Sequence, residues 1–272
     1  MNLRGTLLIS IASSMLCLAP ARAIVNGQFD TFEDGTSEFW GYGLGDWLVK
    51  PGGPGGMSDN YMELFADGSG FQGKFVAFNR SQWLGNYTAA QVNAIEMDIK
   101  AFSIVGAPNV NMRLAFRSST AGGSPGYVTT FAATITADGQ WHHAVFRFST
   151  LTAVGVPPPL ATVLAGPAEV RIMNSTSPNT VTGDNVAGFL GIDNIHAFTD
   201  VSILSTTRLS GGTIRVQGKG VANTTYTIEA TPDLVQTFAA IGTAAAAADG
   251  TFQFDDINAS GFTQRFYRVK TP

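Results

Sequence analysis

The feature of this sequence that most constrains its fold is an alternation of apolar and polar residues with a period of two. In "NMRLAFRSS", Met112, Leu114 and Phe116 fall on one face, and Arg113 and Arg117 fall on the other. Successive side chains of a β-strand point to opposite faces of its sheet, so this pattern predicts a strand. Similar runs, each bounded by turn residues, are "GKFVAFN", "NAIEMDIKAF", "YVTTFAATI", "WHHAVFRFS", "AEVRIMNS" and "FLGIDNIHAF". Many short strands separated by turns predict an all-β antiparallel sandwich.

The pattern breaks near "FTDVSILSTTRLSGG", residues 198–212, and restarts with runs such as "TIRVQG" and "TTYTIEATPDL". We therefore predict two domains, at residues 24–199 and 200–272. The first is expected to be the larger antiparallel sandwich, and the second a smaller immunoglobulin-like β-sandwich. A short helix is expected between the prolines of "LTAVGVPPPLATVLAGPAE".

Residues 1–23 have the three parts of a secretory signal peptide. A basic start is followed by a short apolar run from Leu7 to Leu18, and Ala21-Arg22-Ala23 supplies the small-x-small pattern that signal peptidase recognises. We predict cleavage after Ala23 and a secreted protein, extracellular or at the cell surface. The single cysteine, Cys17, would leave with the signal, so the mature chain is expected to form no disulfide.

Charge composition argues against two kinds of partner. The chain has 20 acidic and 16 basic residues, a net charge of −4, and no cluster of Lys or Arg. Nucleic acids and anionic membranes attract such clusters, so we expect neither as a partner. Beyond the signal segment the apolar runs are too short to span a bilayer. The pattern does not indicate an oligomeric state.

A group of acidic residues is a candidate metal site. Asp30, Glu33 and Asp34 lie close together in sequence, and Asp193 falls in the expected last strand of the first domain. The first and last strands of an antiparallel sandwich often lie side by side, so oxygen ligands from both would converge, with Asp59 or Asn60 as a further donor. Calcium takes six to eight oxygen ligands and suits such a set. The spaced acids of a calcium loop are missing, and solvated turn residues are the alternative interpretation.

The sequence offers no catalytic set. "IVNG" follows the expected cleavage site, as in trypsin-like proteases, but those enzymes need a His base beside a Ser nucleophile. None of His142, His143 and His196 has a fitting context, and "GDSGGP" is absent. A glycosidase needs two carboxylates across a cleft. Glu96 and Asp98 share one strand face, which we interpret as solvated, so we predict a non-catalytic protein; a glycan-active enzyme is the least favoured alternative.

Aromatic side chains are the candidate ligand platforms, because sugars stack the C–H faces of their rings on aromatic faces. We select Trp83 and Tyr87 in "SQWLGNY", which indicates a structured loop, and Trp47 beside a glycine-rich segment. Large aromatic residues are also frequent in cores, so packing is the alternative for each of them. The other candidates in the first domain are Trp40, Tyr61, Tyr127 and Trp141.

Several segments resemble known modules. "FEDGTSEFW" with a closing "GIDNI" resembles the two ends of carbohydrate-binding modules with a jelly-roll fold, and "FNRSQWLGNYTAAQVNAIEMDIKAF" with "DGQWHHAVFRF" resembles a jelly-roll module common in secreted bacterial proteins. The resemblance covers nearly all of residues 24–199 and implies a jelly roll. In the carbohydrate-binding jelly rolls, the acid of the "FE" motif and the Asp of the last strand hold a structural calcium, which implies this role for Glu33 and Asp193. The pair Phe29-Asp30 is a second candidate for that motif.

The C-terminal segment, from "TYTIEATPDL" to "RFYRV", resembles a small β-sandwich that ends many secreted proteins of environmental bacteria, with Tyr267 and Val269 expected to point inward. No chemistry is associated with that module. With these resemblances, the sequence predicts a secreted non-catalytic protein that binds extracellular polysaccharide through a calcium-stabilised jelly roll. The alternative is a structural or adhesive cell-surface protein whose sandwiches contact other proteins.

Overall fold

The computed structural model describes residues 23–42, 47–70, 72–121, 125–221 and 223–270. Strands dominate these residues, which confirms the all-β prediction. The short helix expected between the prolines is present as α1 (Leu160–Ala165), and 3₁₀ turns occupy Phe148–Thr150, Ser210–Gly212 and Ala259–Gly261. No helix in the described ranges is long and apolar enough to cross a membrane. The predicted signal peptide, apart from Ala23, lies outside the described residues.

One antiparallel sheet, which we call the front sheet, has the strand order β10-β6-β13-β4-β3, and β1 also pairs with β13. Its strands are β1 (Phe29–Asp30), β3 (Trp47–Gly53), β4 (Gly56–Asp67), β6 (Ala94–Phe102), β10 (Trp141–Arg147) and β13 (Ala187–Phe198). Phe29 is paired with His196, and Asp30 is paired with Ile195. This pairing confirms the expectation that the first strand of the sandwich lies beside its last strand.

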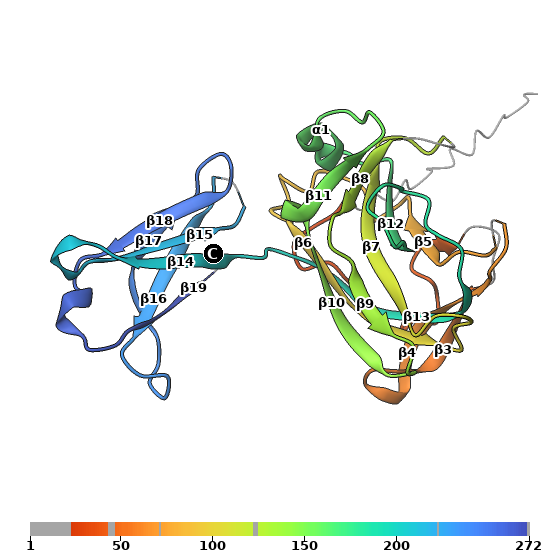
Figure 1. Ribbon diagram of the computed structural model, residues 1–272, viewed down its shortest axis with the longest axis horizontal. Coiled ribbons are helices and arrows are strands. Elements are labelled where there is room, and N and C mark those ends of the chain that lie inside the picture. The colour runs from red at the N-terminus through yellow and green to blue at the C-terminus, as the bar shows by residue number, and fades with distance from the viewer. Residues whose placement is uncertain (1–22, 43–46, 71, 122–124, 222, 271–272) are drawn as a thin grey trace, which may run out of the picture.

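The second sheet, the back sheet, has the order β11-β8-β7-β12-β5-β2, and β9 pairs with β7. Its strands are β2 (Trp40–Tyr42), β5 (Val76–Asn79), β7 (Asn109–Arg117), β8 (Gly126–Thr129), β9 (Ala133–Thr136), β11 (Leu151–Val154) and β12 (Glu169–Asn174). The chain passes repeatedly from one sheet to the other, as a jelly roll does, and the two sheets lie face to face (Figure 1).

Apolar side chains fill the space between the two sheets, because every second residue of these strands is apolar and points inward. Met97 and Ile99 point inward from the front sheet and Leu114 and Phe116 from the back sheet, and all four are fully buried. The prediction that Met112, Leu114 and Phe116 share the core face is therefore confirmed. Sheets pack about 10 Å apart, so these interdigitating side chains form the core of the sandwich.

The outer face of the back sheet is covered. A second buried cluster lies on it, in which Val181, from the segment before β13, packs on side chains of the sheet. These side chains are Val76, Ala115, Val128 and Met173.

Arginines seal the same outer face. Glu169 is fully buried and forms ion pairs with Arg80, Arg117 and Arg171. Burial acts to raise the pKa of Glu169, but the hydrogen bonds and charges of these guanidinium groups outweigh it and hold that pKa below its usual value. The outer face of the back sheet, to which the alternation assigned Arg113 and Arg117, is thus covered. In the part of the chain that the structure describes, no such cluster covers the outer face of the front sheet.

Residues 202–270 form two small antiparallel sheets with the orders β14-β15-β18 and β17-β16-β19. Their strands are β14 (Ser202–Arg208), β15 (Ile214–Lys219), β16 (Thr225–Thr231), β17 (Ala239–Ala245), β18 (Thr251–Asp256) and β19 (Phe266–Lys270). Tyr226, Ile228 and Phe252 form their core, and Tyr267 and Val269 pack against it as expected. Within the described residues, no strand from β14 to β19 pairs with a strand of the front or back sheet (Figure 1). The domain boundary near residue 199 and the immunoglobulin-like character of this unit stay predictions.

The substitution Phe116→Ala tests the assigned core. The Phe116 ring is fully buried and makes edge contacts with the rings of Tyr87 and Phe148. We expect the free energy of unfolding to fall by about 3–5 kcal/mol, because a cavity adds to the lost burial of the ring. Phe131 is 74% exposed, so Phe131→Ala should change the free energy of unfolding by no more than about 0.5 kcal/mol. Urea denaturation followed by tryptophan fluorescence measures both, and equal effects would contradict the assignment.

Candidate functional site

The outer face of the front sheet carries three phenylalanines in a row. Phe189 of β13 stands directly opposite Phe65 of β4 on one side and Phe102 of β6 on the other. Residues directly opposite one another in a sheet share a face. The ring centroids of Phe65 and Phe189 lie 5.1 Å apart, and those of Phe102 and Phe189 lie 5.3 Å apart with planes inclined by 12°. Phe65 is 40% exposed, so this row, the phenylalanine strip, meets solvent.

The next row across the sheet is built around a glycine. Gly191 lies between Glu63 of β4 and Lys100 of β6. A Cβ atom on Gly191 would stand 3.0 Å from the Tyr61 ring and 3.1 Å from the Trp141 ring. The missing side chain lets these two rings meet edge to face, with centroids 5.2 Å apart. The Lys100 ammonium lies 4.2 Å and 4.6 Å from the two centroids, within the range of cation–π contacts.

A hollow of about 260 Å³ lies beside the phenylalanine strip and is lined by Leu48, Lys50, Glu63, Phe65 and Phe189. Glu63 accepts hydrogen bonds from the Lys50 ammonium at 2.5 Å and from the Tyr61 hydroxyl at 2.9 Å. Burial and the bond to Glu63 raise the pKa of Tyr61, so its phenol stays protonated. The hollow therefore combines an apolar aromatic wall with polar groups held in fixed positions.

The other end of this face is polar. A β-bulge between Asp193 and His196 shifts the register, so that His196 pairs with Glu96. His196 Nδ1 lies 2.9 Å from Glu96 Oε1, and His143 Nδ1 lies 3.1 Å from Asp98 Oδ1. Glu96 and Asp98 thus share a half-exposed face, as predicted, and each is held by a histidine. His142 points the other way along β10 and contacts Asp138 instead.

Asp193 is the most unusual acid on this face. Its side chain is fully buried, its Oδ1 accepts the backbone N–H of Asn194 at 2.7 Å, and its Oδ2 has no hydrogen-bond partner. Burial raises the pKa of Asp193 to about 7, and the charges of Asp59, Asp98 and Glu33 add to this shift. A buried carboxylate oxygen without a partner is costly, so something other than the described side chains is needed to satisfy it.

Two of the other predicted ligands approach Asp193. A Cβ atom on Gly53 would stand 2.4 Å from Asp59 Oδ2 and 2.9 Å from Asp193 Oδ2, so both oxygens face the same point beside the β3–β4 hairpin. Glu33 accepts the backbone N–H of Asn60, the residue after Asp59, at 2.8 Å. Within the described residues, no three His, Cys, Asp or Glu side chains enclose a common point as a complete metal site would.

The remaining two predicted ligands are used elsewhere. Asp30 is 4% exposed, and its Oδ2 accepts the indole N–H of Trp40 at 2.8 Å and that of Trp83 at 2.5 Å. Asp34 is exposed, and its Oδ1 accepts the N–H and the hydroxyl of Thr36, both at 2.8 Å. The expected five-acid cluster is therefore wrong. Asp30 is paired with Ile195 and shares its face of the front sheet, which points into the core. Asp193 lies on the outer face of that sheet, so the two carboxylates point to opposite sides.

The predicted ligand-binding aromatics are also placed differently. Trp83 and Tyr87 lie in a loop, as predicted, but both are fully buried in the core. Their selection as ligand-binding residues is therefore wrong, and packing, the alternative, describes them. Trp47 is 40% exposed, but it pairs with Leu64, a core residue, and so lies on the side of β3 away from the phenylalanine strip. The strip itself was missed, because the alternation within each strand does not show which strands become neighbours.

Behind β1, Asp30 forms a carboxyl pair with Glu38. Glu38 Oε1 accepts the backbone N–H groups of Thr31 at 3.2 Å and Phe32 at 2.9 Å. Burial raises the pKa of Glu38 to about 7, and its hydrogen bond to Asp30 and the charge of Asp30 add to the shift. Glu38 therefore keeps its proton up to about neutral pH.

Comparisons with known proteins found no matching family model and no matching curated protein. Three similar solved structures are the family 11 carbohydrate-binding module from Clostridium thermocellum with a β-1,3-1,4-mixed-linked tetrasaccharide, a family 22 xylan-binding domain from Paenibacillus barcinonensis Xyn10C, and an exo-β-agarase. Their TM-scores are 0.40, 0.38 and 0.41, and their identities are 18%, 11% and 10%. The matches cover 64%, 64% and 63% of this chain, and 96%, 97% and 24% of theirs.

The raised pKa values predict a pH-dependent stability. Glu38 and Asp193 hold their protons in the folded protein up to about pH 7, but release them near pH 4 when unfolded. At these two groups the folded state binds more protons in that window, so their contribution to stability should fall as pH rises from about 4 to 7.

The variant Glu38→Gln mimics the protonated acid and should remove its share of this fall. We expect this share to be about 1 kcal/mol of unfolding free energy, a value that is discounted because the carboxyl group is only partly buried. Asp34→Asn, in the same loop but exposed, should leave the slope between pH 5 and 7.5 unchanged. Urea denaturation across this range measures both slopes. A slope for Glu38→Gln that matches the wild-type slope would contradict the raised pKa of Glu38.

Proposed function

We propose that this protein is a secreted, non-catalytic glycan-binding protein that takes up an extended polysaccharide chain on the open face of its front sheet. The phenylalanine strip is the observation that carries this proposal. Its rings cross three neighbouring strands, and among the described residues no second buried cluster covers this face as one covers the back sheet. Exposing apolar rings in a row on a protein surface is unfavourable unless a ligand covers them.

The chemistry beside the strip suits sugars. A pyranose ring offers apolar C–H faces for stacking on aromatic rings and hydroxyl groups at its edge. Lys50 and Glu63 lie in the hollow next to Phe65 and Phe189, so a hydroxyl group of a stacked sugar finds both a donor and an acceptor there. Such sites combine apolar walls with a few placed polar groups.

The arrangement of carboxylates supports binding over hydrolysis. A glycosidase places an acid and a second carboxylate on opposite sides of the scissile bond. Glu63, the carboxylate nearest the strip, is held by Lys50 and Tyr61. Glu96 and Asp98 are bound to histidines at the other end of the face.

We also propose that calcium binds at Glu33, Asp59 and Asp193 and stabilises the fold. The donors are hard oxygens, as calcium requires. The fully buried Asp193 has an Oδ2 atom without a partner, and that atom faces the same point as Asp59 Oδ2. A bound dication would supply the missing partner and offset the repulsion among these carboxylates, joining β4 to β13 at the hairpin end of the sheet.

Polysaccharide binding is the first test. Affinity electrophoresis and pull-down on mixed-linkage β-glucan, xylan, agarose, chitin and starch should show binding to at least one class. Phe65→Ala should weaken that binding about 10-fold or more, because covering one Phe side chain with a ligand contributes about 1.5–3 kcal/mol. The control Phe131→Ala removes a more exposed ring outside the front sheet and should bind normally. A folded protein that binds none of these glycans would instead favour the adhesive role.

Calcium binding is tested by thermal denaturation. Adding calcium at about 100 times its dissociation constant to the EDTA-treated protein should raise Tm by about 5–10 °C. Asp193→Asn should abolish this rise, whereas Asp34→Asn should preserve it, since Asp34 lies outside the proposed site. A calcium response of wild-type size in Asp193→Asn would overturn the assignment of this site.

A further inference from the structure

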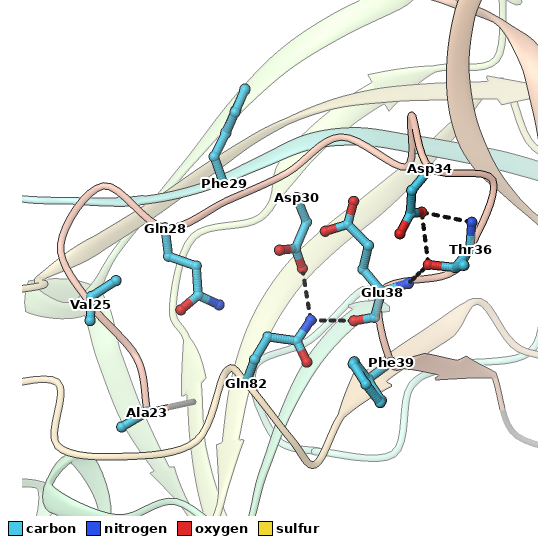
Figure 2. A pocket seen from close by; sticks show the side chains of 10 residues that line it. All are labelled: Ala23, Val25, Gln28, Phe29, Asp30, Asp34, Thr36, Glu38, Phe39 and Gln82. Atoms are coloured by element: carbon cyan, nitrogen blue, oxygen red, sulfur yellow. Dashed lines mark hydrogen bonds between the residues drawn. The ribbon is translucent and has the colours of Figure 1, made fainter. Parts of the chain in front are cut away.

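A pocket of about 730 Å³ lies at the β1 edge of the front sheet, where Figure 2 shows its lining side chains. Ligand pockets have volumes of about 300–1,000 Å³. Phe29, at its rim, is paired with His196, whereas the phenylalanine strip crosses the same strand at Phe189. Seven residues of strand span about 23 Å, so this pocket is separate from the strip.

The rim of the pocket is apolar and exposed. Val25, Phe29 and Phe39 line it and are 57%, 52% and 75% exposed. Glu38 and Phe39 have φ angles of +48° and +62°, in the left-handed region that bulky residues rarely adopt. Such a backbone persists only where its surroundings enforce it. The chain therefore holds the Phe39 ring in solvent in an unfavourable conformation, and the ring gains little packing in return.

The floor of the pocket is polar. Asp30 and Glu38 are occupied by the indole and backbone donors described above, and the Gln82 amide N–H donates to Asp30 Oδ2 at 3.3 Å and to the Glu38 carbonyl oxygen. Two amide atoms are left over: Nε2 of Gln28, a donor, and Oε1 of Gln82, an acceptor, have no hydrogen-bond partner. Both side chains line the pocket (Figure 2).

We propose that this pocket is a second ligand site, which binds one neutral sugar unit of a glycan. A hydroxyl group both donates and accepts, so it complements a spare amide donor and a spare amide acceptor, while the Phe29 and Phe39 rings offer stacking faces to the sugar. Of the described residues that line the pocket, none is Lys, Arg or His. The three carboxyl groups that line it, of Asp30, Asp34 and Glu38, disfavour uronic and sulfated sugars. The inference shares with the proposed function only the glycan nature of the ligand.

Side-chain amide signals give a direct test. The NH₂ signals of Gln28 and Gln82 are followed in ¹⁵N-correlated NMR spectra during titration with methyl β-glucoside and with methyl β-xyloside. At least one of these two glycosides should shift both signals, and the shift should saturate as its concentration rises. Methyl β-glucuronide should bind at least 10-fold more weakly. Choline chloride serves as the cationic probe, because carboxyl groups beside aromatic rings also suit a cation. If neither neutral glycoside shifts these signals, or if choline binds more tightly than both, the sugar site is overturned.

Variants separate this site from the front-sheet site. Phe39→Ala should weaken glycoside binding at the Gln28 and Gln82 signals at least 10-fold and leave polysaccharide binding through the phenylalanine strip, whereas Phe65→Ala should do the opposite. Phe39→Gly should lose glycoside binding and also raise Tm by a few degrees, because glycine adopts a positive φ without strain. A fall in Tm for Phe39→Gly, or unchanged glycoside affinity in both Phe39 variants, would overturn the role given to Phe39.

Discussion

The register of β13 is the constraint on which the open face depends. This strand pairs with β1, β4 and β6. Each outward-facing residue on β13 therefore lies between outward-facing side chains of its neighbouring strands. Phe189 joins two phenylalanines into a row, and Gly191 makes room for Tyr61 and Trp141. A slip of one residue would turn every one of these side chains to the other face. The rows of side chains that cross β4, β13 and β6 therefore follow from the backbone hydrogen bonds of one strand.

The bulge in β13 adds a second effect. Between Asp193 and His196 the strand has one residue more than its partner β6, and Asn194 takes up the turn with φ of +53°. Asn is among the few residues that adopt this conformation readily. The extra residue keeps His196 on the outer face with Glu96 and places Asn194 against Asp98, which it contacts at 2.9 Å. Bulges of this kind redirect side chains at functional surfaces.

Three buried carboxylates differ in the groups that compensate them. Asp30 is satisfied inside the protein, because two indole N–H groups point at one of its oxygens and join β1 to the segments of Trp40 and Trp83. Glu169 is satisfied by arginines. Asp193 is the exception, since one of its oxygens is left without a partner. A buried charge needs a compensating group, and this contrast makes Asp193 the place where a ligand from outside the chain would matter most.

Alternation in the sequence was enough to predict the all-β class, the inward faces of β6 and β7, and the pairing of the first strand with the last, since these depend on local periodicity and on simple sandwich topology. The sites depended on which residues face one another across strands, and no local pattern contains that information. Trp83 and Tyr87 looked like a surface loop but are core rings, because the segment folds back under β1 to meet Asp30 and Phe116. Phe65, Phe102 and Phe189 are far apart in the chain and become one surface only through the register of β13. The sequence by itself thus determined the class of fold and the supply of acids and aromatics, whereas the tertiary structure decided which of them are buried, which are exposed and which meet.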